Sequence, residues 1–255
     1  MSKTHLVLPD SHSHPDYSNN RYDWIGKLIV DKQPDVIVQI GDFADMPSLS
    51  SYDMGKKSFE GRRYTKDIEA SQQAMGRLLT PLAMYNARQY TNRKKIYRPR
   101  QVLTLGNHED RIDRAVNTDP KLEGLISIKD LGYEGFGWEV VPFLDVIEID
   151  GVCFSHYFVT GVSGRPVTSA NTLITKKHVS CVMGHNQQDG IASQYTGANK
   201  RITGIFAGAC YLHDEDYLGP QGNVHWRGVW MLNDVNDGEF EPMQLSLKYL
   251  EKKYG

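Results

Sequence analysis

Four short apolar runs along the chain end abruptly in polar residues. They are His5–Asp10 (HLVLPD), Asp35–Asp42 (DVIVQIGD), Gln101–Asp110 (QVLTLGNHED) and Val179–His185 (VSCVMGH). Each run is rich in valine, isoleucine or leucine and lacks the clean alternation of a half-exposed strand. That pattern is typical of strands buried on both faces, so we expect these runs to be strands.

Helical spacing of apolar residues fills the segments between the runs. Apolar residues share one face from Trp24 to Ile29, after a polar stretch suited to a helix cap. A longer helical pattern extends from about Thr65 to Tyr90, and Asp119-Pro120 is typical of the cap and first turn of a further short helix. Strands that alternate with helices predict a parallel sheet with helices on its faces.

The pattern changes after Trp138. Two later stretches look like hairpins, with turn signals at Asp150-Gly151 and at residues 236–238 (NDG). These hairpins predict a second, mostly antiparallel sheet. The expected fold class is therefore α/β: a two-sheet α/β/β/α sandwich with mixed sheets lying face to face and helices on the outer faces.

We expect a single domain spanning residues 1–255. No linker-like composition and no internal repeat interrupts the sequence of 255 residues. The segment between residues 47 and 99 is long for a minimal crossover between parallel strands. It predicts a helical insertion near residues 47–99 that caps the site.

Cysteine usage and hydropathy indicate the compartment. The three cysteines, Cys153, Cys181 and Cys210, lie far apart in apolar runs, which predicts buried free thiols in a reducing compartment. The apolar run near the N-terminus is too short for a signal peptide. No stretch approaches the roughly 18 apolar residues of a membrane span. We therefore expect a cytoplasmic protein without a membrane partner.

Metal-ligating residue types follow the predicted strands. In open α/β sheets, ligands bind just beyond the carboxyl ends of the strands. A lone Gly-Asp or Gly-His is usually a turn, and a lone buried histidine is usually a hydrogen-bonded core residue. Here five groups occur in series: Asp10-x-His12, Gly41-Asp42-x-x-Asp45, Gly106-Asn107-His108-Glu109, His156 and Gly184-His185. Carboxylate and imidazole ligands suit Mn²⁺, Fe²⁺ or Zn²⁺, and two such ions can clamp a phosphoryl group.

The order and spacing of these groups resemble the calcineurin-like metallophosphoesterase superfamily. Its pattern is Asp-x-His, Gly-Asp-x-x-Asp, Gly-Asn-His-Glu/Asp, a lone His and Gly-His-x-His. The resemblance implies two divalent metal ions. It implies six ligands: Asp10 and His12 at the first ion, Asp42 bridging, and Asn107, His156 and His185 at the second.

The resemblance also implies catalytic roles next to the ligands. Asn107 would serve as both ligand and catalytic residue. His108 would face the substrate without binding metal and would stabilise phosphoryl oxygens or protonate the leaving oxygen. Asp45 would orient His108. A hydroxide bridging the two ions would attack phosphorus in line.

The last motif departs from the superfamily pattern. It reads GHNQQ, so Gln187 stands where a second histidine is usual. A glutamine offers a neutral amide oxygen to the metal or hydrogen-bonds to a metal-bound water. We expect Mn²⁺ to be the favoured ion at the two sites, with Mg²⁺, Fe²⁺ or Zn²⁺ as alternatives.

Charge distribution bears on the substrate. The formal net charge is −2, so any attraction to a polyanion must be local. The stretch from residue 86 to 101 (NARQYTNRKKIYRPRQ) holds six Lys or Arg residues, no acid and two tyrosines. It predicts either a nucleic-acid surface or a solvated helix end. Arg165, Tyr211 and His14 are further candidates for substrate contact.

The leading hypothesis is a metal-dependent phosphodiesterase that hydrolyses DNA, RNA or a nucleotide. The first alternative is a phosphomonoesterase acting on a small molecule or a phosphoprotein. An alternative from another class is a non-catalytic nucleic-acid-binding module with a decayed metal site. The sequence leaves the oligomeric state open.

Overall fold

A six-stranded sheet forms one half of the protein. The structure, a computed structural model, describes residues 2–51, 55–215 and 218–255. The strands of this sheet, in the order β11-β10-β1-β2-β3-β4, are β1 (Lys3–Leu8), β2 (Val36–Gln39), β3 (Arg100–Thr104), β4 (Glu139–Val141), β10 (Gly228–Asn236) and β11 (Glu239–Ser246). Strands β1 to β4 are parallel, whereas β10 runs antiparallel to both β1 and β11.

A five-stranded sheet forms the other half. Its strands, in the order β5-β6-β7-β9-β8, are β5 (Ile147–Ile149), β6 (Val152–Phe154), β7 (Ser180–Met183), β8 (Asp189–Tyr195) and β9 (Arg201–Ala207). The three central strands β6, β7 and β9 are parallel, and the two edge strands are antiparallel to their neighbours.

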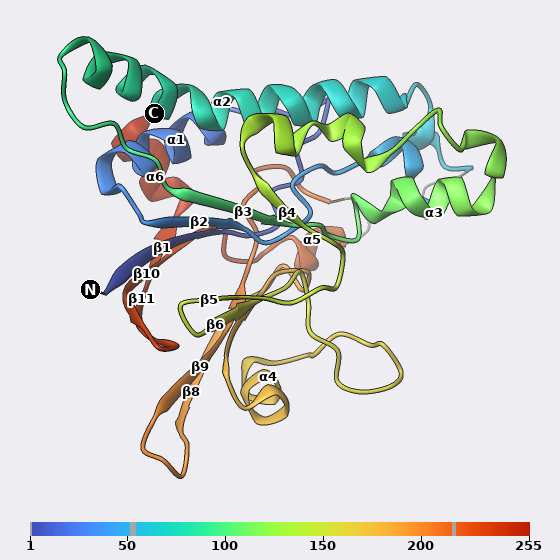
Figure 1. Cartoon of the computed structure of the whole chain (residues 1–255). Helices are drawn as coiled ribbons and strands as arrows, with labels where there is room; N and C mark the ends of the chain where they lie inside the picture. The colour runs from blue at the N-terminus through green and yellow to red at the C-terminus, as the bar shows by residue number, and fades with distance from the viewer. Residues whose placement is uncertain (1, 52–54, 216–217) are drawn as a thin grey trace.

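Helices cover the outer faces of both sheets (Figure 1). The helices are α1 (Arg21–Lys32), α2 (Tyr64–Thr91), α3 (Asp110–Thr118), α4 (Ala170–Lys177), α5 (Gly219–Gly222) and α6 (Leu247–Tyr254). Helix α1 packs between α2 and α6 on the six-stranded sheet, and α4 packs on β8 and β9 of the other sheet.

Three apolar layers hold the fold together. Between the sheets, Val38 of β2 and Ile205 of β9 belong to one fully buried cluster. Leu28 of α1 and Leu78 of α2 lie in a second cluster that joins the helices to the six-stranded sheet. Leu173 of α4 lies in a third, smaller cluster outside the five-stranded sheet. The predicted α/β/β/α sandwich with mixed sheets is confirmed.

The assignment of strands to sheets differs from the expectation in two respects. The second sheet is not mostly antiparallel, because β6, β7 and β9 are parallel. The hairpin β10–β11 belongs to the first sheet, where β10 pairs with β1, while β7 belongs to the second sheet. The physical reason is that β7 and the first half of β10 are both covered on both faces, so both produce the same continuous apolar runs.

The segment predicted as a cap contributes mainly to the outer helical layer. It contains two 3₁₀ turns, Pro47–Leu49 and Lys57–Phe59, followed by α2. Helix α2 lies along α1 and buries Ala74, Met75 and Leu78 against it. The described residues of this segment that line the cavity over the candidate metal centre, Pro47, Ser50, Lys56 and Arg62, all precede α2. The division of the chain into domains stays a prediction.

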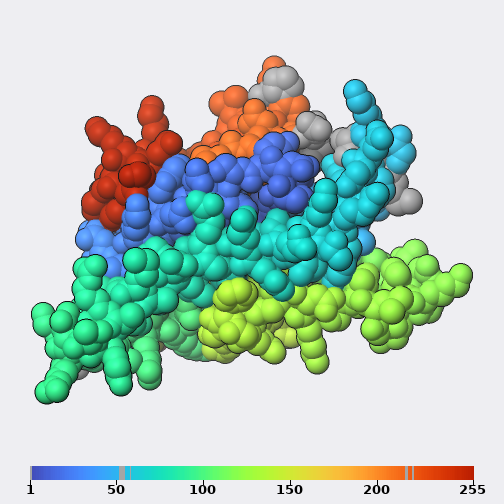
Figure 2. All heavy atoms as spheres, turned by 90° about the horizontal axis from the view of Figure 1, so that it is seen from above, coloured from blue at the N-terminus to red at the C-terminus, as the bar shows by residue number. Residues whose placement is uncertain are grey.

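The basic stretch lies at one corner of the molecule. Helix α2 has 28 residues, and at about 1.5 Å per residue it is roughly 40 Å long. Figure 2 shows its C-terminal end and the following loop, in green, on the side opposite the segment before its N-terminal end, in cyan. The basic residues Arg88 to Arg98 are therefore far from the N-terminal end of α2.

Cys153, Cys181 and Cys210 are all free thiols, and the last two are buried. Among the helices of the described residues, none has both the length and the apolar character needed to cross a membrane.

Candidate metal centre

The predicted ligands meet where β1, β2, β3, β6 and β7 end. Three of them have left-handed backbone conformations, with φ of 42° at His12, 51° at Asp42 and 68° at His185. This conformation costs an L-residue roughly 1–2 kcal/mol. Such strain persists only where the surroundings enforce it, and it clusters at functional sites.

Glycines allow the ligand loops to approach one another closely. A Cβ atom added at Gly106 would collide with the Asp42 carboxylate and backbone nitrogen, and one at Gly184 would collide with the Asp10 carboxylate. The glycine that precedes the predicted ligand in each of these two motifs therefore leaves space for a predicted ligand that follows another strand.

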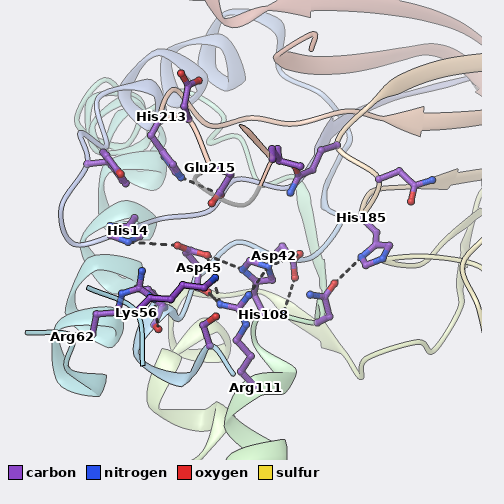
Figure 3. A pocket seen from close by; sticks show the side chains of 18 residues that line it. His14, Asp42, Asp45, Lys56, Arg62, His108, Arg111, His185, His213 and Glu215 are labelled. Carbon is purple, nitrogen blue, oxygen red and sulfur yellow. Dashed lines mark hydrogen bonds and ion pairs between the residues drawn. The ribbon is translucent and has the colours of Figure 1, made fainter. Parts of the chain in front are cut away.

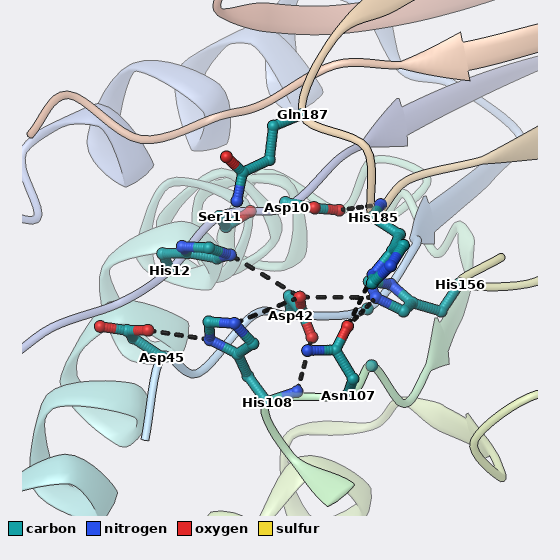
Figure 4. Close-up of polar contacts among 12 residues, drawn as sticks. Asp10, Ser11, His12, Asp42, Asp45, Asn107, His108, His156, His185 and Gln187 are labelled. Atoms are coloured by element: carbon teal, nitrogen blue, oxygen red, sulfur yellow. Dashed lines mark hydrogen bonds and ion pairs between the residues drawn. The ribbon is translucent and has the colours of Figure 1, made fainter. Parts of the chain in front are cut away.

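One cluster of ligand atoms surrounds the Asn107 side chain (Figure 4). Asn107 Oδ1 lies 2.9 Å from His156 Nε2 and 2.7 Å from His185 Nδ1. Asp42 Oδ2 lies 3.4 Å from His156 Nε2. Ligand atoms at metal bonds of about 2.0–2.2 Å are roughly 3 Å apart. His156 Nδ1 donates to the Ile40 carbonyl at 2.9 Å, which leaves Nε2 as the nitrogen that would bind a metal ion.

A second cluster lies on the other side of Asp42. Asp10 Oδ1 accepts a hydrogen bond from the His185 backbone at 3.0 Å. Among the residues that the structure describes, buried Asp10 Oδ2 and His12 Nε2 have no hydrogen-bond partner. Asp42 Oδ2 is 3.7 Å from His12 Nε2. Because buried polar atoms are normally satisfied, these two atoms fit a cation held with Asp42.

The electrostatics of the carboxylates also suit bound cations. Burial raises the pKa of Asp10 to about 6. At Asp42, burial opposes the charge, but the imidazoles of His108 and His156 hold the pKa of that carboxyl well below its usual range. Oxygen and imidazole ligands of this kind accept Mn²⁺, Fe²⁺ or Zn²⁺. The residues present therefore fit a two-ion centre.

His108 is held from two sides next to this centre. Its Nδ1 lies 2.8 Å from Asp45 Oδ1, the contact that the resemblance implied. Arg111, which sequence analysis did not single out, donates from Nη2 to His108 Nε2 at 3.0 Å and from Nη1 to the Asp45 carbonyl at 2.8 Å. Arg111 was missed because nothing in its local sequence marks it; α3 brings it back towards the motif that precedes it.

Glu109 ties the ligand loops together. Its carboxylate accepts backbone hydrogen bonds from Asp42 at 3.0 Å, Ala44 at 2.9 Å and Gly106 at 2.9 Å. It thereby fixes the loop after β2 to the loop after β3. The position of Glu109 in the Gly-Asn-His-Glu motif marks this residue in the sequence, but the sequence analysis assigned it no role.

Glu215 orients a predicted ligand from a distant part of the chain. Its Oε1 lies 2.7 Å from His12 Nδ1 and 3.3 Å from His213 Nε2. Burial opposes its charge, but hydrogen bonds with His12 and His213 lower the pKa of Glu215 to about 2. A carboxylate acceptor at Nδ1 fixes the proton there and leaves His12 Nε2 for the metal.

The residue that departs from the superfamily pattern lies beside the second cluster. The Tyr211 hydroxyl donates to Gln187 Oε1 at 2.9 Å, and the Gln187 amide nitrogen points towards Ser11 and Asp10 (Figure 4). The oxygen that a metal would need thus already accepts a hydrogen bond. Tyr211 is fully buried and stacks on His12, with ring centroids 4.8 Å apart.

A cavity of about 450 Å³ opens over the candidate metal centre. It contains His14, whose Nε2 is 3.7 Å from Asp45 Oδ2, and Figure 3 shows Lys56, Arg62 and Arg111 on one side of it. Arg165 lies on an exposed loop and is absent from the described lining of this cavity.

The predicted ligands and His108 are thus assembled at one edge of the fold. The site has the motif order of the calcineurin-like metallophosphoesterases.

No family model matches the chain. Two curated proteins are similar to it, both called Gene 54 protein. The one from Mycobacterium phage L5 is 28% identical over 203 residues, 77% of this chain and 74% of that protein. The one from Mycobacterium phage D29 is 28% identical over 200 residues, 75% of this chain and 71% of that protein.

Two solved structures are also similar. YfcE, a phosphoesterase from E. coli, has a TM-score of 0.40 and 11% identity over 96% of this chain and 99% of that chain. TT1561 of Thermus thermophilus has a TM-score of 0.37 and 10% identity, with the same coverage of 96% and 99%.

Proposed function

We propose that this protein is a metal-dependent phosphoesterase, and that it is a phosphodiesterase acting on nucleic acid or a nucleotide. The observation that carries the proposal is the convergence of two groups of ligand atoms on either side of Asp42. Two of these atoms, Asp10 Oδ2 and His12 Nε2, are buried without a hydrogen-bond partner within the described residues. A decayed binding module would have no reason to keep them unpaired, because such atoms cost about 1–3 kcal/mol each.

The chain's own residues have separate tasks in this proposal. Two bound divalent ions would supply Lewis acidity towards the phosphoryl oxygens and would lower the pKa of the attacking water. Asp10, His12 and Asp42 would hold one ion, and Asn107, His156 and His185 would hold the other with Asp42.

His108 and Arg111 act on the substrate. Arg111 donates to His108 Nε2 in this structure, so a phosphoryl oxygen that enters between them accepts a hydrogen bond from Arg111 in place of that imidazole nitrogen. Asp45 keeps the proton on His108 Nδ1 and steadies the ring. When His108 is protonated on both nitrogens, Nε2 is the atom that gives its proton to the departing ester oxygen.

Metal-dependent hydrolysis of two aryl phosphates tests the proposal. Protein stripped of metal and reloaded with Mn²⁺ is compared on bis-p-nitrophenyl phosphate and p-nitrophenyl phosphate. We expect faster cleavage of the diester, lost in Asp42→Asn and in His108→Ala. Asp113→Asn, an exposed carboxylate on α3, is the matched control and should keep full activity.

The other outcomes are also informative. Faster cleavage of the monoester would replace the diesterase by a phosphomonoesterase. Activity that survives in Asp42→Asn would show that hydrolysis does not occur at this centre.

A further inference from the structure

A second, smaller cavity adjoins the first. It has a volume of about 190 Å³ and shares Asn107, Arg111 and His185 with the cavity over the metal centre. Its own lining includes Arg114 and Tyr157. Pockets for drug-sized molecules measure about 300–1,000 Å³, so this cavity suits a fragment of a longer substrate. The two cavities together form a path that passes beside the metal ligands Asn107 and His185.

Two arginines on α3 give the second cavity its charge. Arg111 and Arg114 are three residues apart on the helix and are therefore neighbours on its surface. Arg114 Nη2 donates to the Asn107 carbonyl at 2.7 Å, and Arg114 Nε lies 3.0 Å from Asp110 Oδ2. These contacts fix the guanidinium beside a metal ligand, while 52% of the side chain remains exposed. A planar guanidinium held in this way matches a phosphate group.

An aromatic ring forms another wall of the second cavity. The Tyr157 ring lies 4.7 Å from the His185 ring and meets Phe143 edge-on at 5.7 Å. Rings that are packed in place lose little entropy when a base stacks on them. Base-aromatic stacking is the usual way in which proteins hold single-stranded nucleic acid without regard to sequence.

The first cavity also contains aromatic rings and cationic side chains. Tyr17 stacks on His213 with ring centroids 4.3 Å apart and planes 2° apart. Lys56 and Arg62 lie in the same cavity. Cationic and aromatic side chains therefore occur on both sides of the metal centre. A phosphomonoester would occupy only one side, whereas a phosphodiester chain would extend into both.

We propose that the second cavity is a subsite for the nucleotide next to the scissile phosphate in a single-stranded nucleic acid. Arg114 contacts the neighbouring phosphate, and Tyr157 stacks on its base. The subsite rests on the proposed diesterase function and extends it to a substrate class. This subsite is a different location from the basic stretch 86–101, which the sequence suggested as a nucleic-acid surface. That stretch lies away from the candidate metal centre, at the far end of α2.

Comparison of substrates of increasing length tests the subsite. The probes are bis-p-nitrophenyl phosphate, a tetrathymidylate and a tetrauridylate, the last two separating DNA from RNA. We expect Arg114→Ala and Tyr157→Ala each to lower the ratio of kcat/KM on the oligonucleotide to that on the bis-aryl ester by about tenfold. This size follows from the roughly five- to 150-fold worth of one stacked base. Tyr157→Phe keeps the ring and should keep the ratio.

A control and a second readout separate this inference from the proposed function. Arg93→Ala, in the basic stretch, should leave the ratio unchanged. Binding of fluorescein-labelled hexathymidylate to metal-stripped protein, followed by fluorescence anisotropy, should weaken about tenfold in Tyr157→Ala. An unchanged ratio in both Arg114→Ala and Tyr157→Ala, with bis-aryl ester still cleaved, would overturn the subsite and leave the diesterase standing. If the wild type cleaves nothing, unchanged binding in Tyr157→Ala overturns the subsite on its own.

Discussion

Replacement of Glu215 should weaken metal binding without touching a metal ligand. Glu215 Oε1 lies 2.7 Å from His12 Nδ1, and only 12% of the Glu215 side chain is exposed. The carboxylate keeps the proton on Nδ1, so that Nε2 faces the Asp42 carboxylate at 3.7 Å. Without Glu215, the His12 ring can rotate and its proton can move to the nitrogen that the metal needs.

The size of the effect follows from the strength of this contact. Partners that orient metal-ligating histidines are typically worth 10–100-fold in metal affinity, which is about 1.4–2.8 kcal/mol. Glu215→Gln retains an oxygen acceptor but loses the charge, so we expect about tenfold weaker binding. Glu215→Ala loses both, and we expect a loss near 100-fold.

Calorimetric titration of Mn²⁺ into metal-stripped protein measures the loss of metal affinity directly, independently of catalysis. One of the two binding events should weaken while the other changes less, since His156 and His185 do not contact Glu215. Asp214→Asn is the matched control: Asp214 is 75% exposed and pairs with Arg227, so its loss should leave both events unchanged. If Glu215→Ala is folded by circular dichroism and binds both ions with wild-type affinity, the positioning role of Glu215 is refuted.

Three further predictions concern the loops and the core. Gly106→Ala should abolish binding of at least one ion in a folded protein, because the added methyl group displaces the Asp42 carboxylate; equal Mn²⁺ stoichiometry by elemental analysis would contradict this. Arg21→Ala should lower the free energy of unfolding by about 1–3 kcal/mol, since buried Arg21 donates to the backbone carbonyls of Ser11 and Ser18; urea denaturation measures it. Leu28→Ala, at a fully buried position of α1, should cost about 2–5 kcal/mol in the same assay while leaving Mn²⁺ affinity unchanged.

Local features of the sequence were sufficient to predict the strands that precede the candidate ligands, whereas β8 and β9 were not predicted. Each ligand immediately follows or closely trails an apolar run, so its position at a strand end follows from a few neighbouring residues. His156 and His185 meet Asn107 because the strands before them end at the same edge of the fold.

Features that depend on tertiary packing could not be predicted in this way. Glu215 is 203 residues away from His12, and no local pattern indicates that the two meet. The sheet to which β7 and β10 belong depends on pairing partners, because buried strands of either sheet have the same apolar composition. Tyr211 was expected to contact substrate, but its ring is buried against His12.

We expect this chain to hold two divalent ions, one on either side of Asp42. The most direct test is an anomalous difference map from crystals of the Mn²⁺-loaded protein. We expect two peaks about 3.5–4 Å apart, one beside Asp10 and His12 and the other beside Asn107, His156 and His185. The absence of both peaks from this edge of the fold, or a single ion held by Glu215 and His213 instead, would contradict this expectation.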